Sequence, residues 1–343
     1  MTIEKPVPTL NDVAQLAGVS TATVSRCLNT PDRVIKATRE RVMSAVQELG
    51  YAPNFAARVM AAKRSNTIGA IIPTMENAIF ARGLQAFQDV LHARGYTLLV
   101  ASSSYSAEIE EEQIRNLVSR GADGLLLIGH DRNPGIDRFL ATQNVPIMVA
   151  WTFDADADIP SIGFDNLASM RALAEQVIDL GHRNLALITA DTVDNDRARL
   201  RLHGVKDAMQ RRGLDPDNLQ IVMTAYDIDE GAQAFELLMK STECPTAVMC
   251  GNDVIAVGAL RQALALGMEV PRDVSITGFD DIELARIVQP ALTTVHVPHR
   301  EMGRKAAEAL IDMVERKVAR ATSEKLAARV QLRQSLGPPP TGA

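Results

Sequence analysis

Residues 9–29 have the sequence TLNDVAQLAGVSTATVSRCLN. Thr9 is a good N-cap residue, and Asp12 stands three positions later, where a capping box places an acidic side chain. Ser20 is a second cap, and the Gly18-Val19 pair between the two segments favours a turn. Apolar residues recur at helical spacing in both segments. The stretch therefore predicts two short helices joined by a turn of about three residues.

This arrangement is a helix-turn-helix, in which the second helix lies in the DNA major groove, about 12 Å wide. If Val24 and Leu28 face the protein core, then Thr21, Ala22 and Arg26 face outward. An arginine can bind a guanine edge through two hydrogen bonds, and small side chains can contact a thymine methyl group. The alternative is an ordinary amphipathic helical hairpin with no role in DNA binding.

The charge distribution favours the first of these interpretations. Residues 1–65 contain nine Lys and Arg against five Asp and Glu, a net charge of +4. The rest of the chain holds 27 basic and 37 acidic residues, so it carries −10. A small basic head on an acidic body indicates that only the head meets a polyanion.

After residue 66 the pattern alternates between short apolar runs and amphipathic segments, which predicts an α/β fold of parallel sheets covered on both faces. Two such series indicate two doubly wound units. We expect a third head helix at 37–49. Strands are expected at 68–72, 96–101, 124–128, 146–150, 185–189, 220–223, 247–250, 275–278 and 326–332.

Length and composition set further limits. A chain of 343 residues with 46% hydrophobic residues predicts two or three compact domains. The three cysteines, Cys27, Cys244 and Cys250, match no disulfide framework and no metal spacing, as expected for a reducing cytoplasm. We expect no targeting segment, no membrane span and no membrane partner.

Several motifs together carry a resemblance to a known family. The head contains DVA at 12–14, AGVS at 17–20 and TVSR at 23–26, followed by TRE at 38–40 and GYAPN at 50–54. The body contains DN at 165–166, GHR at 181–183, ND at 252–253, GFDD at 278–281 and TTV at 293–295. In this order over residues 9–335, the series resembles the lac repressor/gal repressor (LacI/GalR) family.

The resemblance implies a homodimeric, cytoplasmic repressor that binds a palindromic double-stranded operator and responds to a small-molecule effector. It implies a small all-α helix-turn-helix head plus hinge helix, then two doubly wound parallel-sheet subdomains of periplasmic-binding-protein type I. The expected parts are a head at 1–52, a hinge helix and linker at 53–66, a first subdomain at 67–163 with 296–323, a second at 164–295 with 324–336, and a disordered tail at 337–343.

The DNA-binding prediction covers the exposed start of the second helix, short polar side chains that suit phosphates, and the hinge. The full set is Thr9, Leu10, Asn11, Ser20, Thr21, Ala22, Thr23, Ser25, Arg26, Asn29, Arg33, Thr38, Tyr51, Asn54, Ala57, Arg58 and Met60. In the family, a hinge leucine is wedged into the minor groove, and Met60 occupies that position here. A plain tether is the alternative interpretation of residues 53–63.

A second departure from the family is Ile35, which stands where a Ser or similar residue usually caps the third helix. Losing such a cap costs on the order of 1 kcal/mol. The nearby Asp32 is a candidate to compensate.

The resemblance also implies an effector site in the cleft between the subdomains. The matching positions are Asn77, Phe80, Trp151, Arg201, Tyr226, Asn252, Asp280 and His299. We expect a sugar, sugar acid or related metabolite of unknown identity, held by Arg201, Asn252 and Asp280 against an aromatic ring. Trp151 stands where sugar-binding members often have an acidic residue.

Each of these residues has a simpler interpretation. Trp151 is also consistent with interface packing, Arg201 with a surface ion pair and Asp280 with a helix cap, while a structural role is favoured for His299. The spacing of His296 and His299 resembles a metal pair, but no third ligand is near, so no metal and no cofactor are predicted.

The sequence argues against two other classes of protein. A solute-binding protein would have a secretory signal and no helix-turn-helix. An α/β enzyme would have a catalytic motif, and the sequence contains no P-loop, no GxGxxG, no GxSxG and no HExxH. No catalytic residue and no enzyme activity are therefore predicted.

Overall fold

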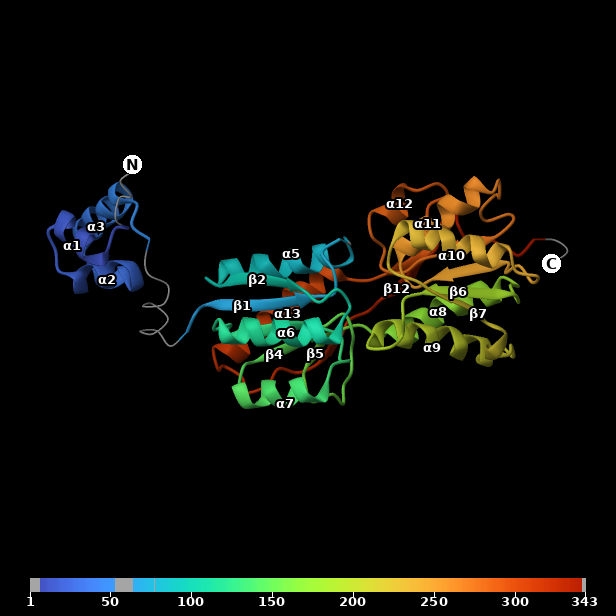
Figure 1. Ribbon diagram of the computed structural model, residues 1–343, viewed down its shortest axis with the longest axis horizontal. Helices are drawn as coiled ribbons and strands as arrows, with labels where there is room; N and C mark the ends of the chain where they lie inside the picture. The colour runs from blue at the N-terminus through green and yellow to red at the C-terminus, as the bar shows by residue number, and fades with distance from the viewer. Residues whose placement is uncertain (1–6, 53–63, 77, 341–343) are drawn as a thin grey trace. The chain divides into compact units, whose positions relative to one another are not determined.

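The computed structural model describes residues 7–52, 64–76 and 78–340. The chain divides into two compact units, Met1–Ser65 and Asn66–Ala343 (Figure 1). The first unit is entirely helical over its described residues, and the second is built from parallel sheets and helices.

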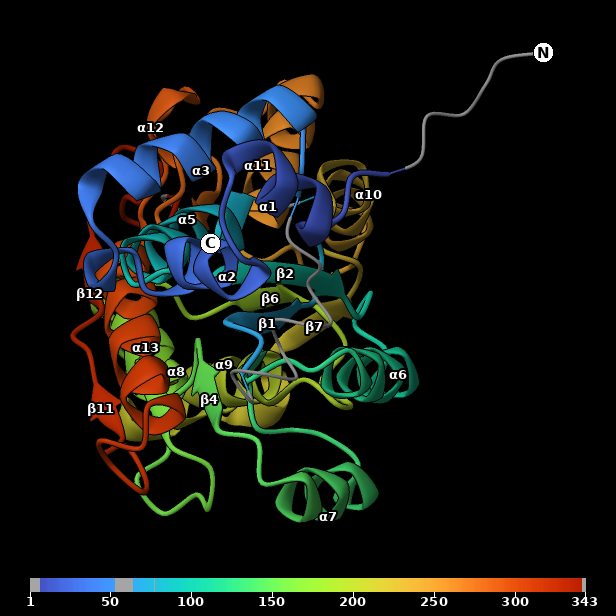
Figure 2. The same cartoon turned by 90° about the vertical axis from the view of Figure 1, so that its left-hand side faces the viewer.

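The head contains α1 (Leu10–Ala17), α2 (Thr21–Asn29), the short 3-10 helix η1 (Pro31–Arg33) and α3 (Lys36–Leu49). The three α-helices of the head lie together (Figure 2). Its core is small: Val13, Val24 and Val42 contribute one fully buried side chain from each α-helix. Both predicted helices of the helix-turn-helix are confirmed, and α3 begins one residue earlier than expected.

The first subdomain of the body is built on a six-stranded parallel sheet with the order β11-β5-β4-β3-β1-β2. Successive residues of its strands alternate between two cores, one under α5 and α13 and the other under α6 and α7. These elements are β1 (Thr67–Ile72), α5 (Ala78–Ala93), β2 (Thr97–Ser102), α6 (Ala107–Ser119), β3 (Gly124–Ile128), α7 (Pro134–Gln143), β4 (Ile147–Ala150), β5 (Ser161–Gly163), α13 (His299–Val314) and β11 (Glu324–Lys325).

The second subdomain has a four-stranded parallel sheet with the order β7-β6-β8-β9. In its helical layers α8 packs against α9, and α10 against α11. The elements are α8 (Asn166–Asp179), β6 (Leu185–Thr189), α9 (Asp196–Arg211), η2 (Pro216–Asn218), β7 (Gln220–Met223), α10 (Ile228–Met239), β8 (Ala247–Cys250), α11 (Asp253–Ala265), β9 (Ser275–Thr277) and α12 (Leu284–Ile287).

A two-stranded antiparallel sheet of β10 (Thr294–His296) and β12 (Arg329–Gln331) lies where the chain passes between the subdomains. The chain crosses between β5 and α8, between β9 and α13 through β10, and again between β11 and β12. Because the strands within each large sheet are parallel, their carboxyl ends lie at one edge, where ligands of such folds usually bind. Among the described residues, no helix has the length and apolar character needed to span a membrane.

The C-terminal region corrects three predictions. The strand expected at 326–332 is confirmed only at Arg329–Gln331, which form β12. A separate strand, β11, precedes it, and the buried Leu326 between the two donates its N–H to the carbonyl of Gly163 at 2.7 Å. β11 pairs with β5, so residues 324 and 325 belong to the first subdomain and not to the second. The predicted disordered tail is also wrong at Gly337, whose N–H donates to Ser275 Oγ at 3.1 Å and whose carbonyl lies 2.8 Å from His182 Nε2.

Candidate functional site

Side-chain caps begin both helices of the helix-turn-helix, and a left-handed glycine ends the first. The N–H of Thr9 donates to Asp12 Oδ2 at 2.8 Å, and the N–H of Asp12 donates back to Thr9 Oγ1 at 3.4 Å. Hydrogen bonds from the backbone and hydroxyl of Thr9 lower the pKa of Asp12. Gly18 ends α1 in the left-handed conformation with φ 63°, and Ser20 Oγ accepts the N–H of Thr23 at 3.2 Å to begin α2. Local sequence chemistry therefore determines where α1 begins and ends and where α2 begins.

The exposed side of α2 matches the predicted DNA-reading surface. Val24 and Cys27 are buried in the head core, whereas Thr21, Ala22 and Arg26 are exposed. The guanidinium of Arg26 makes no hydrogen bond or ion pair within the described part of the chain. An exposed arginine without a protein partner is available for a base edge.

The other predicted DNA-binding residues occupy the surrounding surface of the head. Thr9, Asn11, Ser20, Asn29 and Arg33 are exposed, and Leu10, Thr23, Ser25, Thr38 and Tyr51 are partly buried. Asn54, Ala57, Arg58 and Met60 lie outside the described residues. The start of α3 has no side-chain cap: Ile35 is 75% exposed, and Asp32 does not compensate with a hydrogen bond to it.

In the body, six of the eight predicted effector residues line one cavity: Phe80, Trp151, Arg201, Tyr226, Asn252 and Asp280. Ile79, Tyr105 and Arg197 complete its lining, and sequence reasoning missed all three. The cavity has a volume of only about 20 Å³. Asn77 lies outside the described residues, and His299 lies outside the lining.

Arg201 holds the second-subdomain side of this cavity together. Its side chain is almost fully buried, so it is not the surface ion pair considered from the sequence. Its Nε donates to Asn166 Oδ1 at 2.9 Å and its Nη1 to the Gly251 carbonyl at 2.6 Å, while Nη2 lies 3.6 Å from Asp280 Oδ1. The guanidinium also covers the ring of Phe279, 3.8 Å from its centre. These contacts satisfy a charge that would otherwise be costly to bury.

Two neighbouring carboxyl groups have opposite environments. Both side-chain oxygens of Asp280 are buried without a hydrogen bond from any residue that the structure describes, and burial raises its pKa to about 6 against the attraction of Arg201. Burial also acts on Asp281, but hydrogen bonds from Arg286, Arg333 and His296 hold its pKa below the usual value. Asp281 is therefore structural, and Asp280, which caps no helix, is open to a ligand.

Other polar atoms near Asp280 also lack partners among the described residues. Asn252 caps α11 through its oxygen, which accepts the N–H of Ile255 at 2.9 Å, and leaves its Nδ2 unbonded. The indole N–H of Trp151 is buried without an acceptor. With the two free oxygens of Asp280, these atoms provide hydrogen-bond donors and acceptors for a polar molecule.

Aromatic rings form the rest of the wall. Trp151 is 1% exposed, has the left-handed φ of 63°, and meets Phe80 edge to face at 5.2 Å between ring centres. A bulky residue at positive φ is a strained position of the kind found at functional sites. Tyr105 and Tyr226, 5.3 Å apart, come from the two different subdomains. Both tyrosines also line a groove of about 890 Å³, so the groove and the cavity adjoin at this ring pair.

His299 lies outside the cavity lining and contacts the backbone of Asp280. Burial lowers its pKa to about 4, so the ring is neutral at pH 7, and its Nε2 lies 3.1 Å from the carbonyl of Asp280. Because a carbonyl only accepts hydrogen bonds, Nε2 carries the proton. The structure thus places His299 against the backbone of Asp280.

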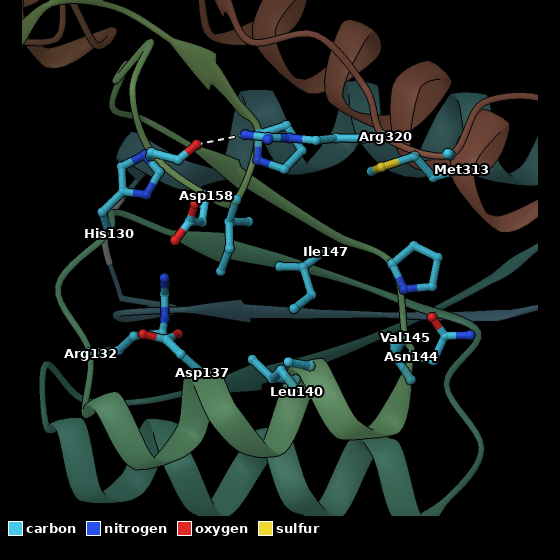
Figure 3. Close-up of a pocket in the computed structure, with 16 residues that line it drawn as sticks. His130, Arg132, Asp137, Leu140, Asn144, Val145, Ile147, Asp158, Met313 and Arg320 are labelled. Atoms are coloured by element: carbon cyan, nitrogen blue, oxygen red, sulfur yellow. Dashed lines mark hydrogen bonds between the residues drawn. The ribbon is translucent and has the colours of Figure 1, made fainter.

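A separate hollow of about 670 Å³ lies between α7 and residues 157–160, near Arg320 (Figure 3). None of the predicted effector residues lines it. Arg132 is occupied by Glu110 and the Gly129 carbonyl, and Arg320 by the Ala157 carbonyl. Its two arginines are therefore committed to the protein itself, whereas His130 Nε2 is buried without a hydrogen-bond partner among the described residues.

Comparison with known proteins decides the family. Residues 9–54 match "Bacterial regulatory proteins, lacI family", and residues 174–336 match "Periplasmic binding protein-like domain". The transcriptional repressor CytR of Escherichia coli K12 is 34% identical over 313 residues, covering 91% of each chain. The chain belongs to the LacI family.

Solved structures agree with this assignment. A LacI-family transcriptional regulator from Silicibacter pomeroyi has a TM-score of 0.87 at 26% identity, over 96% of this chain and 99% of the other. The lac repressor dimer bound to operator and an anti-inducer has a TM-score of 0.84 at 27% identity, with the same coverage. The predicted family and fold class are confirmed.

The uncapped start of α3 gives a first prediction for this regulator. Replacing Ile35 with Ser should stabilise the head by about 1 kcal/mol, because a serine oxygen can accept a free N–H of the first turn. Urea unfolding followed by helical circular dichroism measures the change. Ile35→Ala, which removes the exposed side chain without adding a cap, should give no such gain; an equal gain would refute the capping explanation.

The pKa of Asp280 gives a second prediction. Below the ordinary aspartate pKa the folded and unfolded chains are both protonated at this group. Between about pH 4 and 6 only the unfolded chain ionises, so the wild type should lose stability relative to Asp280→Asn as the pH rises through this window. Denaturant unfolding of both proteins at several pH values measures the difference. A stability gap that does not change between pH 4 and 6 would contradict the assignment.

Proposed function

We propose that this LacI-family protein is a transcriptional repressor that binds a palindromic operator as a dimer and is controlled by a small metabolite in the cleft of its body. The observation that carries the DNA-binding part is the exposed face of α2, where Arg26 has a free guanidinium beside Thr21 and Ala22. The lac repressor, which is similar over nearly the whole chain, has been solved as a dimer on its operator.

The residues of the head have distinct proposed roles. Arg26 donates two hydrogen bonds to a guanine, and Thr21 and Ala22 contact a neighbouring base edge. The hydroxyl and amide groups around them donate to phosphates and set the orientation of the helix without reading the sequence. The hinge residues Asn54, Ala57, Arg58 and Met60 are proposed to contact the minor groove, with Met60 as an apolar wedge.

Exposed apolar side chains on two edge strands support the dimer. β2 and β7 end their sheets, and both carry large apolar residues that are between about a third and a half exposed: Leu99, Val100, Ile221 and Met223. Apolar edge strands are rarely left uncovered, because their free backbone groups attract other chains. A second copy of this chain is the proposed cover.

The effector is proposed to be a sugar, a sugar acid or a related hydroxylated metabolite. Asp280 offers two free acceptor oxygens, and Asn252 and Trp151 offer free donors, beside aromatic rings that can pack on a sugar face. Hydroxyl groups satisfy such a set because each can donate and accept. The proposed site is Phe80, Trp151, Arg201, Tyr226, Asn252 and Asp280. Asn77, outside the described residues, is retained as a proposed member.

We place this protein in the cytoplasm, where its DNA target lies, and assign it no catalytic step, because its relatives are transcriptional regulators. A gel shift with the DNA upstream of its own gene separates this proposal from a solute-binding protein or an enzyme. Specific retardation that weakens steeply with salt is expected of a repressor. Equal binding to random DNA would overturn the proposal.

Arg26→Ala tests sequence reading. Loss of a two-bond base contact should reduce discrimination between operator and random DNA by about 1–3 kcal/mol. Competition gel shifts measure the ratio. Arg41→Ala, a charge change on α3 outside the proposed surface, serves as the control; an unchanged ratio for Arg26→Ala would remove Arg26 from the base contacts.

Arg201→Lys tests the effector site. Lysine keeps the positive charge near Asp280 but cannot reproduce the forked contacts to Asn166 and Gly251. A thermal-shift screen of sugars, sugar acids and hydroxy acids would first identify a ligand. Calorimetry should then show at least about tenfold weaker binding in the variant. Arg171→Lys, in a surface pair with Asp207, is the matched control; equal affinities for Arg201→Lys and wild type would refute the assignment.

A further inference from the structure

The hollow between α7 and residues 157–160 is a second cavity of the body. Its volume of about 670 Å³ falls within the range of roughly 300–1,000 Å³ that is typical of small-molecule pockets. It is built by the first subdomain alone, from α7, the segments on either side of this helix, the end of α13 and residues 319–320. Among the described residues, none lines both this hollow and the cavity around Asp280.

One end of the hollow contains a buried imidazole nitrogen. His130 Nε2 is buried and has no hydrogen-bond partner within the described part of the chain. Burial lowers the pKa of His130, so its ring is neutral at pH 7 and one of its two nitrogens is an acceptor. A buried polar atom without a partner costs free energy, and a bound ligand is one way to supply the partner.

Two carboxyl groups line the hollow at the same end (Figure 3). Neither Asp137 nor Asp158 makes a hydrogen bond or an ion pair with any residue that the structure describes. Burial raises the pKa of Asp137, and the charge of Asp158 adds to the rise. Asp137 lies in the first turn of α7, where a carboxylate is favourable, but Asp158 lies outside any helix or strand and has no such local role. Two carboxylates that repel each other favour a cation between them.

The arginines that line the hollow do not supply that cation. Arg132 Nε donates to Glu110 Oε1 at 3.1 Å and Nη2 donates to the Gly129 carbonyl at 2.7 Å, so its charge is already matched. Arg320 is exposed, where water and salt screen its charge, and it donates to the carbonyl of Ala157. Neither arginine forms an ion pair with the two carboxyl groups of the hollow.

The rest of the hollow is largely apolar. Leu140 of α7, Ile147 of β4 and Met313 of α13 contribute aliphatic side chains (Figure 3). Leu140 and Met313 are buried in the protein, and Ile147 is partly exposed. A ligand that fits both regions has a polar head and a hydrocarbon body, and each methylene that it buries here adds about fourfold in affinity.

We propose that this hollow is a second ligand site, for a small organic cation: an amine whose ammonium group lies between Asp137 and Asp158 and whose hydrocarbon body enters the apolar region. An ammonium group has donors and no acceptor, so it can donate to both carboxylates and to His130 Nε2. A ligand carboxylate or phosphate would instead meet two like charges. This site is separate from the DNA-binding head and from the proposed effector cavity.

Three probes of equal chain length test the proposed chemistry: hexylamine, hexan-1-ol and hexanoate. In full-length protein with ¹³C-labelled methionine methyl groups, an NMR titration reads binding at Met313, whose signal is identified by its loss in Met313→Leu. Hexylamine should shift this signal with at least about tenfold higher affinity than hexanoate, because only the amine carries a charge opposite to that of the carboxylates. No shift with hexylamine, or equal affinity for either of the other probes, would overturn the proposal.

Matched variants locate the site. Ala141 is an exposed residue of α7 that lines the hollow, so Ala141→Phe should fill the hollow and abolish the shift. Ala265→Phe, at an exposed position of α11 in the second subdomain, is the control and should bind like the wild type. Asp137→Asn and Asp158→Asn should each weaken hexylamine binding about threefold and leave hexan-1-ol unaffected. Wild-type affinity in Ala141→Phe would overturn the proposed site.

The single tryptophan separates this site from the effector cavity. Trp151 is the only Trp of the chain and lines that cavity, so its fluorescence reports binding there. A change at Trp151 with none at Met313 would place hexylamine in the effector cavity and overturn the second site. Because the titration contains neither operator nor sugar, its failure would leave the proposed repressor function untouched.

Discussion

The buried guanidinium of Arg201 is the constraint on which the cleft depends. A buried positive charge is costly unless it is paired and hydrogen-bonded. The partners of Arg201 come from three separate places in the chain: Asn166 at the start of α8, the Gly251 carbonyl after β8, and Asp280 after β9. The contacts of the Arg201 side chain therefore hold the carboxyl ends of β8 and β9 against the first turn of α8.

The constraint extends to the first subdomain through Asn166. The amide oxygen of Asn166 accepts from Arg201, and its Nδ2 donates to the carbonyl of Trp151 at 3.0 Å. Trp151 follows β4 of the first sheet and packs on Phe80. One fully buried amide thus connects the two walls of the cavity, so a ligand that moves Arg201 acts on both walls through bonds that already exist.

What the sequence could predict depended on the range of the interactions involved. The helix-turn-helix follows from contacts within a few residues, such as the Thr9–Asp12 capping box and the left-handed Gly18, and these were predicted correctly. β5 has only three residues and was missed, because its strand character comes from pairing with β4 and β11. Arg201 and Asp280 were located by family resemblance. Arg197 was not, because its bond to Ile128 spans 69 positions of sequence and has no local signature.

Contacts between the two subdomains have a thermodynamic consequence for regulation. A ligand shifts the equilibrium between two arrangements of the subdomains only by the difference in its affinity for them, so the contacts between the subdomains help set the concentration at which such a protein responds. If operator DNA favours one of the two states, linkage requires effector and operator to change each other's affinity by the same factor. A contact between the subdomains that lies outside the cavity lining, such as that of Asp196 with the N–H of His130, can therefore adjust the response, because it acts on the equilibrium between the two arrangements and not on ligand recognition.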